Sequence, residues 1–447
     1  MKKIKLIAMM VTIAISVSAF AGCGSKSVVN SQDSSKKETV ALKLWGGVPP
    51  EYGPQEVVDN FNKEFKDKGI QVEYNRFVND DQGNLKVDTG LLAGGDLDLY
   101  MSYGMDTLKK RASGKMALDL TSFIKKDKFD MAKNFGDVIK NYNIDGKTYA
   151  VPETLTNSGI LINKNMFDAA GIKVPTSWTY DEFRAIAKKL TKGEGQDKTY
   201  GMFFNTAQQA NYAASFIGSA LGGDPYYKEG GKESNFDNNA FEKNLQLTSD
   251  MMNVDKSAVS HIDTVTQKLT IEGLFLSGKT AMSLGVWSTR SIKDTTKYPH
   301  TFMTAYAPFP TVDKQPAKYT VGGLGDYLSI NPKSKYTQQA WDFIKWYSEK
   351  GSLPMAKYGR VPSSKNVDKA AVLKASTEGA EKLLDTKSFN NIMVKSYTNY
   401  GISTITNKSA EISKVFNEEC ESVLTKQKTT RQAMQSAKER ADTLLKQ

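Results

Sequence analysis

The stretch NYNIDGKTYAVPETLTNSGILINKNMFDAAGIKVPTSWTYDEF, residues 141–183, decides the fold of this chain. Asp145-Gly146 predicts a hairpin turn, and residues 147–151 predict a short strand that Pro152 closes. An apolar strand is expected at residues 159–162, followed by a helix and a loop marked by proline. The stretch therefore alternates strands and helices, as α/β proteins do.

The second helix of this stretch carries its own start signal. Thr179 stands three residues before Glu182, so each side chain can satisfy the other's free backbone N–H. Apolar residues then recur at helical spacing, at Phe183, Ile186, Ala187 and Leu190. We therefore expect a helix that begins near residue 180.

The order of these pieces resembles the extracellular solute-binding proteins of carbohydrate ABC importers, the maltose-binding-protein-like group. In that family a DGK-Tyr-Ala-Val-Pro strand crosses between two lobes, polar residues beyond the proline face the ligand, and an Ile-Leu-Ile-x-Asn-Lys strand follows. The matching segments here are 145–147, 149–152 and 160–164. Three later segments resemble further family strands, KTAMSLGVW at 279–287, GGLGDYLSI at 322–330 and GRVP at 359–362.

The resemblance implies a two-lobed α/β fold, in which each lobe is a mostly parallel sheet flanked by helices and hinge crossings join the lobes. Lobe 1 would hold residues 39–150 and 322–360, and lobe 2 would hold residues 151–321 and 361–447. Independently of the resemblance, the strand and helix patterns of residues 39–101 predict right-handed βαβ units. Hinges of this kind allow two lobes to close on a ligand.

The N-terminal segment reads as a targeting signal. Lys2, Lys3 and Lys5 precede an apolar run at residues 6–20, which is too short to favour a membrane span. Small residues before Cys23 resemble the site at which bacterial lipoproteins are cleaved and acylated, so residues 1–22 are expected to be a lipoprotein signal peptide. A plain secretory signal is the alternative. Residues 24–38 are polar and fit a flexible tether that follows the lipidated cysteine.

Charge and cysteine content narrow the function classes. The formal net charge is +11, and it falls to +8 when the three lysines of the signal are removed. The remaining basic residues are scattered without interleaved aromatic residues, so we expect no nucleic-acid partner. Beyond Cys23 the chain holds only Cys420, whose acidic neighbours favour a structural role over a nucleophilic one.

A sugar site needs aromatic faces for C–H patches and polar groups for hydroxyls. By family position, Trp287 and Tyr212 are the aromatic candidates, with core packing as the alternative, and Trp45 fits either a stacking platform or the core. Glu153, which follows Pro152, is ambiguous, and we do not include it among the candidate ligand-binding residues. The further candidates lie at strand ends or crossings, where a solvated loop is the alternative reading: Glu51, Tyr103, Asp106, Thr156, Asn157, Asp326 and Arg360.

Enzyme functions find little support in the sequence. His261 and His300 are the only histidines and lack ligand spacing, so no metal site is expected. Neither a Gly-x-Ser-x-Gly elbow nor a phosphate loop is present, and we expect no catalytic activity and no cofactor. A secreted carbohydrate hydrolase with two carboxylates remains the main alternative, although a (β/α) barrel would repeat strand and helix eight times.

The family resemblance, with the signal that precedes Cys23, implies a monomeric binding protein that is anchored by lipid at Cys23 on the extracellular face of the cell membrane. It would capture a sugar or oligosaccharide between its lobes and deliver it to the membrane subunits of an ABC importer. The sequence leaves open which sugar is bound, whether it is neutral or acidic, and whether another small solute takes its place.

Overall fold

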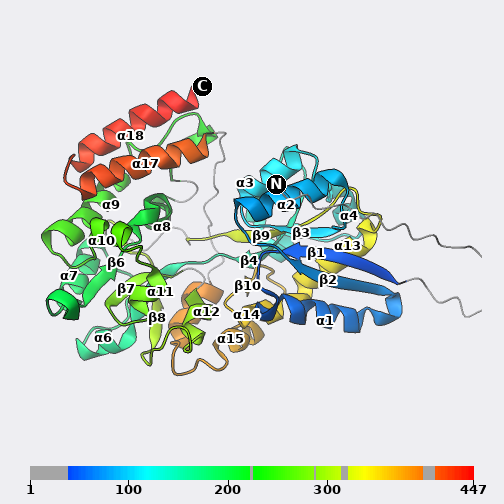
Figure 1. Ribbon diagram of the computed structural model, residues 1–447, viewed down its shortest axis with the longest axis horizontal. Coiled ribbons are helices and arrows are strands. Elements are labelled where there is room, and N and C mark those ends of the chain that lie inside the picture. Colours follow the sequence, from blue (N-terminus) through cyan, green and yellow to red (C-terminus); the bar gives the residue numbers. More distant parts are fainter. Residues whose placement is uncertain (1–38, 222–224, 286–287, 314–320, 396–407) are drawn as a thin grey trace, which may run out of the picture. The chain divides into compact units, whose positions relative to one another are not determined.

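Two β-sheets organise the chain, of which the computed structural model describes residues 39–447 except 222–224, 286–287, 314–320 and 396–407. Residues 39–447 form one unit that carries both sheets (Figure 1). The six-stranded sheet has the order β10-β4-β9-β3-β1-β2 and the four-stranded sheet the order β6-β7-β5-β8. The strands are β1 Val40–Gly46, β2 Ile70–Arg76, β3 Leu99–Ser102, β4 Val151–Leu155, β5 Gly159–Asn163, β6 Tyr200–Phe203, β7 Thr280–Gly285, β8 Thr304–Ala307, β9 Leu324–Ile330 and β10 Val361–Pro362.

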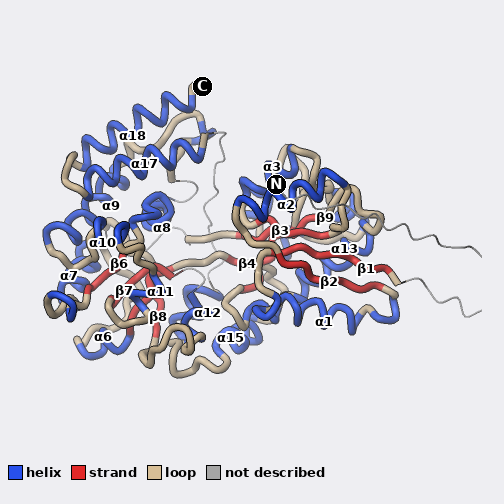
Figure 2. The backbone as a smooth tube through the Cα atoms, viewed as in Figure 1, coloured by secondary structure: helices blue, strands red, loops and turns tan. Residues whose placement is uncertain are grey.

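The first helices cover opposite faces of the six-stranded sheet. Leu99 and Met101 of β3 join the core that holds α1, whereas Tyr100 joins the core that holds α2 and α3. This alternation follows from the two-residue period of a strand. Figure 2 shows the sheet between these helices, which are α1 Pro54–Glu64, α2 Asp81–Ala93 and α3 Met105–Ser113. Because β1 pairs in parallel with β2 and β3, the expected βαβ units are confirmed.

The sheets are mixed, and the expectation of mostly parallel sheets is wrong. In the described chain the parallel pairs of named strands are β1 with β2, β1 with β3, and β6 with β7. The other pairs are antiparallel, including both neighbours of β9 and both neighbours of β5. The strand-helix-strand pattern that predicts parallel pairing covers residues 39–101 only, and of the later strands β9 and β5 lie antiparallel to both of their neighbours.

The deciding stretch folds largely as predicted, with one correction. Asp145 and Gly146 have φ of 50° and 74°, and Ile144 bridges Lys147, so the hairpin turn is confirmed. The strand, however, is Val151–Leu155 and runs through Pro152 instead of ending there. A proline lacks only the backbone donor, and its carbonyl here accepts a hydrogen bond from Ser363 Oγ at 2.7 Å.

A second core surrounds the four-stranded sheet. The predicted capping box of Thr179 and Glu182 is present at the start of α7 Tyr180–Leu190. Helices α8 Gln209–Leu221, α9 Asn239–Ser249, α17 Ser409–Leu424 and α18 Thr430–Leu445 contribute to the same core, and α17 lies against α18 (Figure 1). Cys420 is buried there, and burial raises the pKa of its thiol well above the usual range, as a structural role requires.

The remaining helices lie around the two sheets and the connections between their strands. They are α4 Thr121–Lys126, α5 Met131–Phe135, α6 Lys164–Ala169, α10 His261–Thr266, α11 Ile271–Phe275, α12 Ser288–Lys293, α13 Thr337–Trp346, α14 Leu353–Ala356, α15 Lys369–Thr377 and α16 Thr386–Phe389. Leu161 of β5 and Tyr306 of β8 belong to the four-stranded sheet but join the core of the six-stranded sheet, so the buried clusters do not mark the lobe boundaries. Among the described helices, none combines the length and the apolar character that crossing a bilayer requires.

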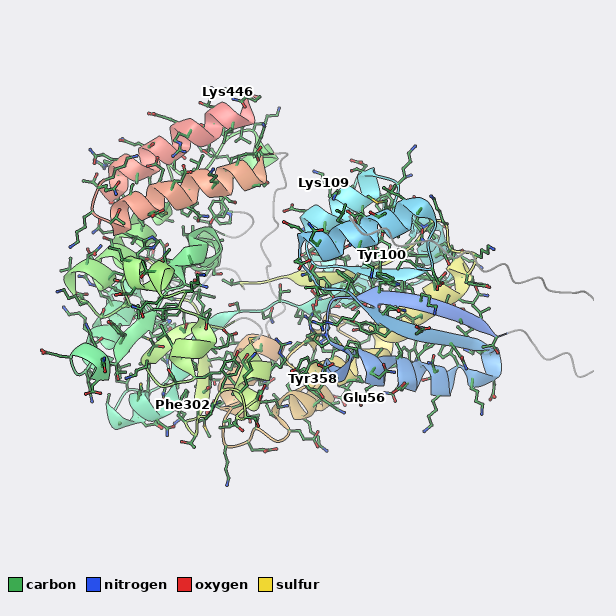
Figure 3. All side chains as sticks on the ribbon, viewed as in Figure 1. Glu56, Tyr100, Lys109, Phe302, Tyr358 and Lys446 are labelled. Atoms are coloured by element: carbon green, nitrogen blue, oxygen red, sulfur yellow. The ribbon has the colours of Figure 1, made fainter. Side chains whose placement is uncertain are left out.

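A buried arginine ties α2 and α3 to the end of β3. Arg111 is fully buried, and its guanidinium donates to Asp88 Oδ1 at 2.8 Å, to the Met101 carbonyl at 3.0 Å and to Ser102 Oγ at 2.9 Å. Tyr100, labelled in Figure 3, lies under the guanidinium at 5.3 Å. Burial opposes the charge of Asp88, but hydrogen bonds from Lys110 and Arg111 hold its pKa below the usual value. The end of β3 is thereby fixed.

We expect Arg111→Ala to lower the free energy of unfolding by about 3–5 kcal/mol, because it removes the buried partner of Asp88. Urea unfolding followed by circular dichroism measures this loss. Arg431→Ala, on the exposed surface of α18, is the control and should change the value by less than about 0.5 kcal/mol. A loss below about 1 kcal/mol for Arg111→Ala would contradict the structural role of this arginine.

Candidate ligand-binding site

A cavity of about 540 Å³ opens beyond the ends of several strands of the six-stranded sheet. This size is typical of small-molecule sites, and the carboxyl ends of strands are where α/β sheets bind ligands. Segments far apart in the sequence meet there, and the lining residues are Asn79, Tyr103, Gly104, Met105, Asn141, Tyr142, Thr156, Gly322 to Tyr327, and Arg360. We call this space the ligand cavity.

Glycines allow the start of β9 to lie directly on Thr156. Gly322 has φ of 126°, and a Cβ at this position would lie 2.4 Å from the Thr156 carbonyl oxygen. A Cβ on Gly325 would lie 2.6 Å from Thr156 Cγ2. The Thr156 backbone N–H donates to the Gly323 carbonyl at 2.9 Å. Backbone therefore forms part of the cavity wall, where side chains would fill the space.

Tyrosine rings form the apolar part of the wall. The rings of Tyr142 and Tyr327 are 5.9 Å apart at an angle of 42°. The Leu324 N–H donates to the Tyr142 hydroxyl at 3.1 Å, and the Tyr327 hydroxyl donates to the Leu324 carbonyl at 2.7 Å. The Gly47 N–H donates to the Tyr103 hydroxyl at 2.6 Å. With their hydroxyls held by backbone, these rings are fixed in orientation and can cover C–H surfaces of a ligand.

The charged part of the wall is an ion pair between Asp326 and Arg360. Asp326 is buried and has φ of 52°, a left-handed conformation that residues other than glycine rarely adopt. Burial raises the pKa of Asp326, although the charge of Arg360 opposes this. The guanidinium carbon also lies 5.9 Å from the centre of the Tyr103 ring. Among the described lining residues, these are the charged side chains, and together they are neutral.

The chain just before Arg360 is held by packing. Tyr358, labelled in Figure 3, meets the Tyr52 ring edge-on at 5.4 Å. Gly359 has φ of 81°, and a Cβ there would lie 2.7 Å from Thr289 Cβ. These contacts fix the position from which the arginine side chain extends.

Four of the residues predicted from the sequence meet at the ligand cavity, namely Tyr103, Thr156, Asp326 and Arg360. Trp287 and Cys23 lie outside the described residues, and their roles stay predictions. In the described residues no cluster of three or more His, Cys, Asp or Glu side chains could hold a metal ion.

The structure does not bring the other five predicted residues to the cavity wall. Tyr212 is 1% exposed and packs between Phe204 and Phe216 in the second core, so its ring covers protein atoms. Asn157 is buried and donates to the Met393 carbonyl at 3.0 Å. Trp45 is half-buried and packs against the core that holds α2 and α3, with Lys86 above its ring at 5.2 Å. Glu51 and Asp106 are exposed outside the lining.

Sequence reasoning missed six side chains of the wall, Asn79, Met105, Asn141, Tyr142, Leu324 and Tyr327. Asn79 follows the end of β2, so the strand-end rule that selected Tyr103 after β3 could have found it. Tyr327 stands inside the glycine-rich motif next to Asp326. For Tyr142, which ends the 3-10 segment Asp137–Tyr142, the sequence gives no comparable signal.

Comparison with protein families gives a match over most of the chain. The model of the family described as bacterial extracellular solute-binding protein matches residues 48–354. A multiple sugar-binding protein of Streptococcus mutans is 28% identical over 236 residues, which are 50% of this chain and 52% of that protein. The chain thus spans about half the length of this curated relative.

Solved structures share the fold. A sugar transporter protein from Rhizobium etli, in an open conformation, has a TM-score of 0.72 and 21% identity, and the match covers 90% of this chain and 99% of that one. An ABC substrate-binding protein from Listeria monocytogenes, in complex with cycloalternan, has a TM-score of 0.69 and 21% identity, with coverage of 92% and 100%. At these identities the comparison establishes a common α/β architecture.

We expect Arg360→Met to lower the free energy of unfolding by about 3–5 kcal/mol, because it leaves the buried Asp326 without its partner. Adding Asp326→Asn to this variant should recover part of the loss, as a double-mutant cycle measures. Lys357→Met is the matched control, since its partner Glu56 is solvent-accessible and the pair is worth at most about 1 kcal/mol. Strictly additive losses would show that Asp326 and Arg360 are not coupled.

Proposed function

Because the chain belongs to the family of bacterial extracellular solute-binding proteins, we propose that it captures a neutral sugar or oligosaccharide and delivers it to an ABC importer. The observation that carries this proposal is the ligand cavity, where fixed tyrosine rings, amide side chains and backbone carbonyls surround a neutral ion pair. A sugar offers both the C–H faces and the hydroxyls that such a wall can bind.

The charge of the wall supports a neutral ligand. An acidic sugar needs a cation that is available to its carboxylate, usually an arginine. Arg360 already forms an ion pair with the buried Asp326, so a second carboxylate would compete with an existing partner. A planar guanidinium next to a carboxylate can instead serve adjacent sugar hydroxyls, one as donor and the other as acceptor. Neutral sugars are therefore the ligands that we favour among the alternatives that the sequence leaves open.

The same wall supports binding without chemistry. Glycoside hydrolysis needs two carboxyl groups that flank the scissile bond. Among the described residues that line the ligand cavity, Asp326 is the single carboxylate, and it is already engaged in the ion pair with Arg360. The carbohydrate hydrolase is therefore the weaker candidate, and a solute-binding protein for a ligand other than sugar is the alternative within the family.

The cellular setting is part of the same proposal. Residues 1–22 would direct export, Cys23 would carry the lipid, and residues 24–38 would hold the folded protein away from the membrane. The membrane subunits of the importer would receive the sugar, and their ATPases would supply the energy for transport. The division into two lobes that close over the ligand, and the monomeric state, belong to this proposal as well.

A panel of neutral mono- and oligosaccharides and acidic sugars, tested by thermal unfolding of the purified protein, checks the ligand class. A neutral sugar at about a hundred times its Kd should add about 2.7 kcal/mol to the free energy of unfolding. The matching acidic sugar should bind at least tenfold more weakly. The proposal would be contradicted if acidic sugars bind and no neutral sugar does, or if the protein releases sugar fragments.

Asn79→Ala tests whether the ligand cavity is the site. The side chain is exposed and its oxygen accepts from Asn84, which leaves the amide N–H groups for a ligand. Losing one such hydrogen bond should weaken sugar binding about two- to tenfold, measured by isothermal titration calorimetry. Asn60→Ala, on the exposed face of α1, is the control. Equal affinity of both variants and wild type would place the site elsewhere, and Trp287→Ala then tests the other predicted wall residue.

Cys23→Ser tests the lipid anchor. We expect the variant to move from the membrane fraction into the medium and to lose incorporation of labelled palmitate, because stable attachment rests on acyl chains. Cys420→Ser is the matched control, since this thiol is buried in the second core and should not affect fractionation. Membrane association of Cys23→Ser equal to that of wild type would contradict the lipoprotein proposal.

A further inference from the structure

A second carboxylate lies directly behind the ligand cavity. Glu153 stands in the middle of β4, a central strand of the six-stranded sheet, and is only 7% exposed. Its backbone carbonyl accepts from the Ser363 N–H at 3.0 Å, so the residue is fixed at the β10 side of the strand. A glutamate in such a position is rare unless its charge is paired or removed.

Glu153 faces a small inner chamber of about 30 Å³. Asp326, Arg360 and Tyr103 line both this chamber and the ligand cavity, so their side chains are the wall between the two spaces. Tyr74, Thr154 and Tyr347 complete the polar lining, and the rest is apolar, with Leu44, Val57, Met101 and Met355 among its members. Any charge on Glu153 therefore acts on the ion pair through low-dielectric surroundings.

The charges of the inner chamber do not balance if every acid is ionised. Asp326 and Glu153 are two carboxylates, and Arg360 is the one guanidinium in the described lining. Asp326 holds Arg360 in the ion pair, whereas Glu153 shares the lining of the chamber with Tyr347. A net negative charge in this space would be costly, and a single proton on Glu153 removes it.

We propose that Glu153 is a positioning residue of the sugar site, which keeps its proton in the folded protein so that Arg360 stays with Asp326 at the wall of the ligand cavity. The positioning role rests on the proposed function, while the protonation does not depend on it. An ionised Glu153 would compete with Asp326 for the guanidinium and draw it toward the inner chamber.

The titratable groups around Glu153 agree with this assignment. Burial and then the charge of Asp326 raise the pKa of Glu153 well above its usual value, against the opposing effects of Tyr347 and Arg360. The tyrosines supply no positive charge, and burial raises the pKa of Tyr74, Tyr103 and Tyr347. The Tyr74 hydroxyl donates to the Val48 carbonyl at 2.6 Å, and the Tyr103 hydroxyl is held by Gly47, so both have backbone partners.

A raised pKa in the folded state fixes the sign of the pH dependence. Above the pKa of a glutamate in the unfolded chain, which is about 4.3, Glu153 of the folded protein retains a proton that the unfolded chain releases. Stability from this group is therefore present at low pH and is lost as the pH rises toward the folded pKa. Glu153→Gln keeps the shape of the neutral acid but does not titrate, so this loss is absent from the variant.

The first test compares unfolding equilibrium constants of wild type and Glu153→Gln from urea denaturation between pH 5 and pH 7. The ratio of the wild-type constant to the Gln constant should rise by up to tenfold per pH unit. Glu194→Gln, an exposed loop substitution, is the matched control and should give a constant ratio. A constant ratio for Glu153→Gln would overturn the assigned proton.

The second test measures sugar affinity at pH 6 by calorimetry. Glu153→Ala should weaken binding at least tenfold, because the space that it vacates lets Arg360 turn from Asp326 into the inner chamber. Glu153→Gln should recover most of this loss, because it fills the same space with a neutral polar group. Equal affinity of Glu153→Ala and wild type would overturn the positioning role, and so would a Gln variant as weak as the Ala variant. If wild type binds no sugar of the panel, the proposed function fails, and the pH dependence of the unfolding ratio still decides whether Glu153 holds a proton.

Discussion

The ion pair between Asp326 and Arg360 is the interaction on which the candidate site depends. It joins β9 to the segment that leads into β10, and it lies in the wall that the ligand cavity shares with the inner chamber. A buried carboxylate without a partner strongly destabilises the folded state, so the pair also fixes which strand ends can meet at the cavity. The left-handed backbone of Asp326 is a local cost that persists because the surrounding contacts determine it.

Most of the correctly predicted parts of the fold depend on sequence patterns between residues that are close in the chain. The capping box of Thr179 and Glu182 and the turn at Asp145 involve neighbours in the chain, and both were found where the sequence places them. The direction of strand pairing depends on long-range contacts, and there the expectation of mostly parallel sheets failed. Pro152 shows the limit of a composition rule, because a missing donor does not prevent a residue from lying within a strand.

The site was predictable in part for a similar reason. Tyr103 and Arg360 stand next to motifs that end or begin strands, and the ends of neighbouring strands lie together at one edge of a sheet. Tyr212 has an aromatic side chain in a suitable segment, but whether a helix face turns to a cavity or to the core depends on packing that no spacing encodes. Glu153 was omitted because nothing in its neighbours reveals that a second acid, Asp326, comes close to the same arginine from a strand far along the chain.

The glycines at the start of β9 shape the site without presenting a side chain to it. Gly322 and Gly325 are needed because the Thr156 backbone and methyl group occupy the space that a Cβ would take. In a saturation mutagenesis experiment selected for sugar uptake, these positions would rank among the least tolerant in the chain, alongside the residues that touch the ligand. A map of mutational sensitivity would thus outline the cavity by the absence of side chains as well as by their presence.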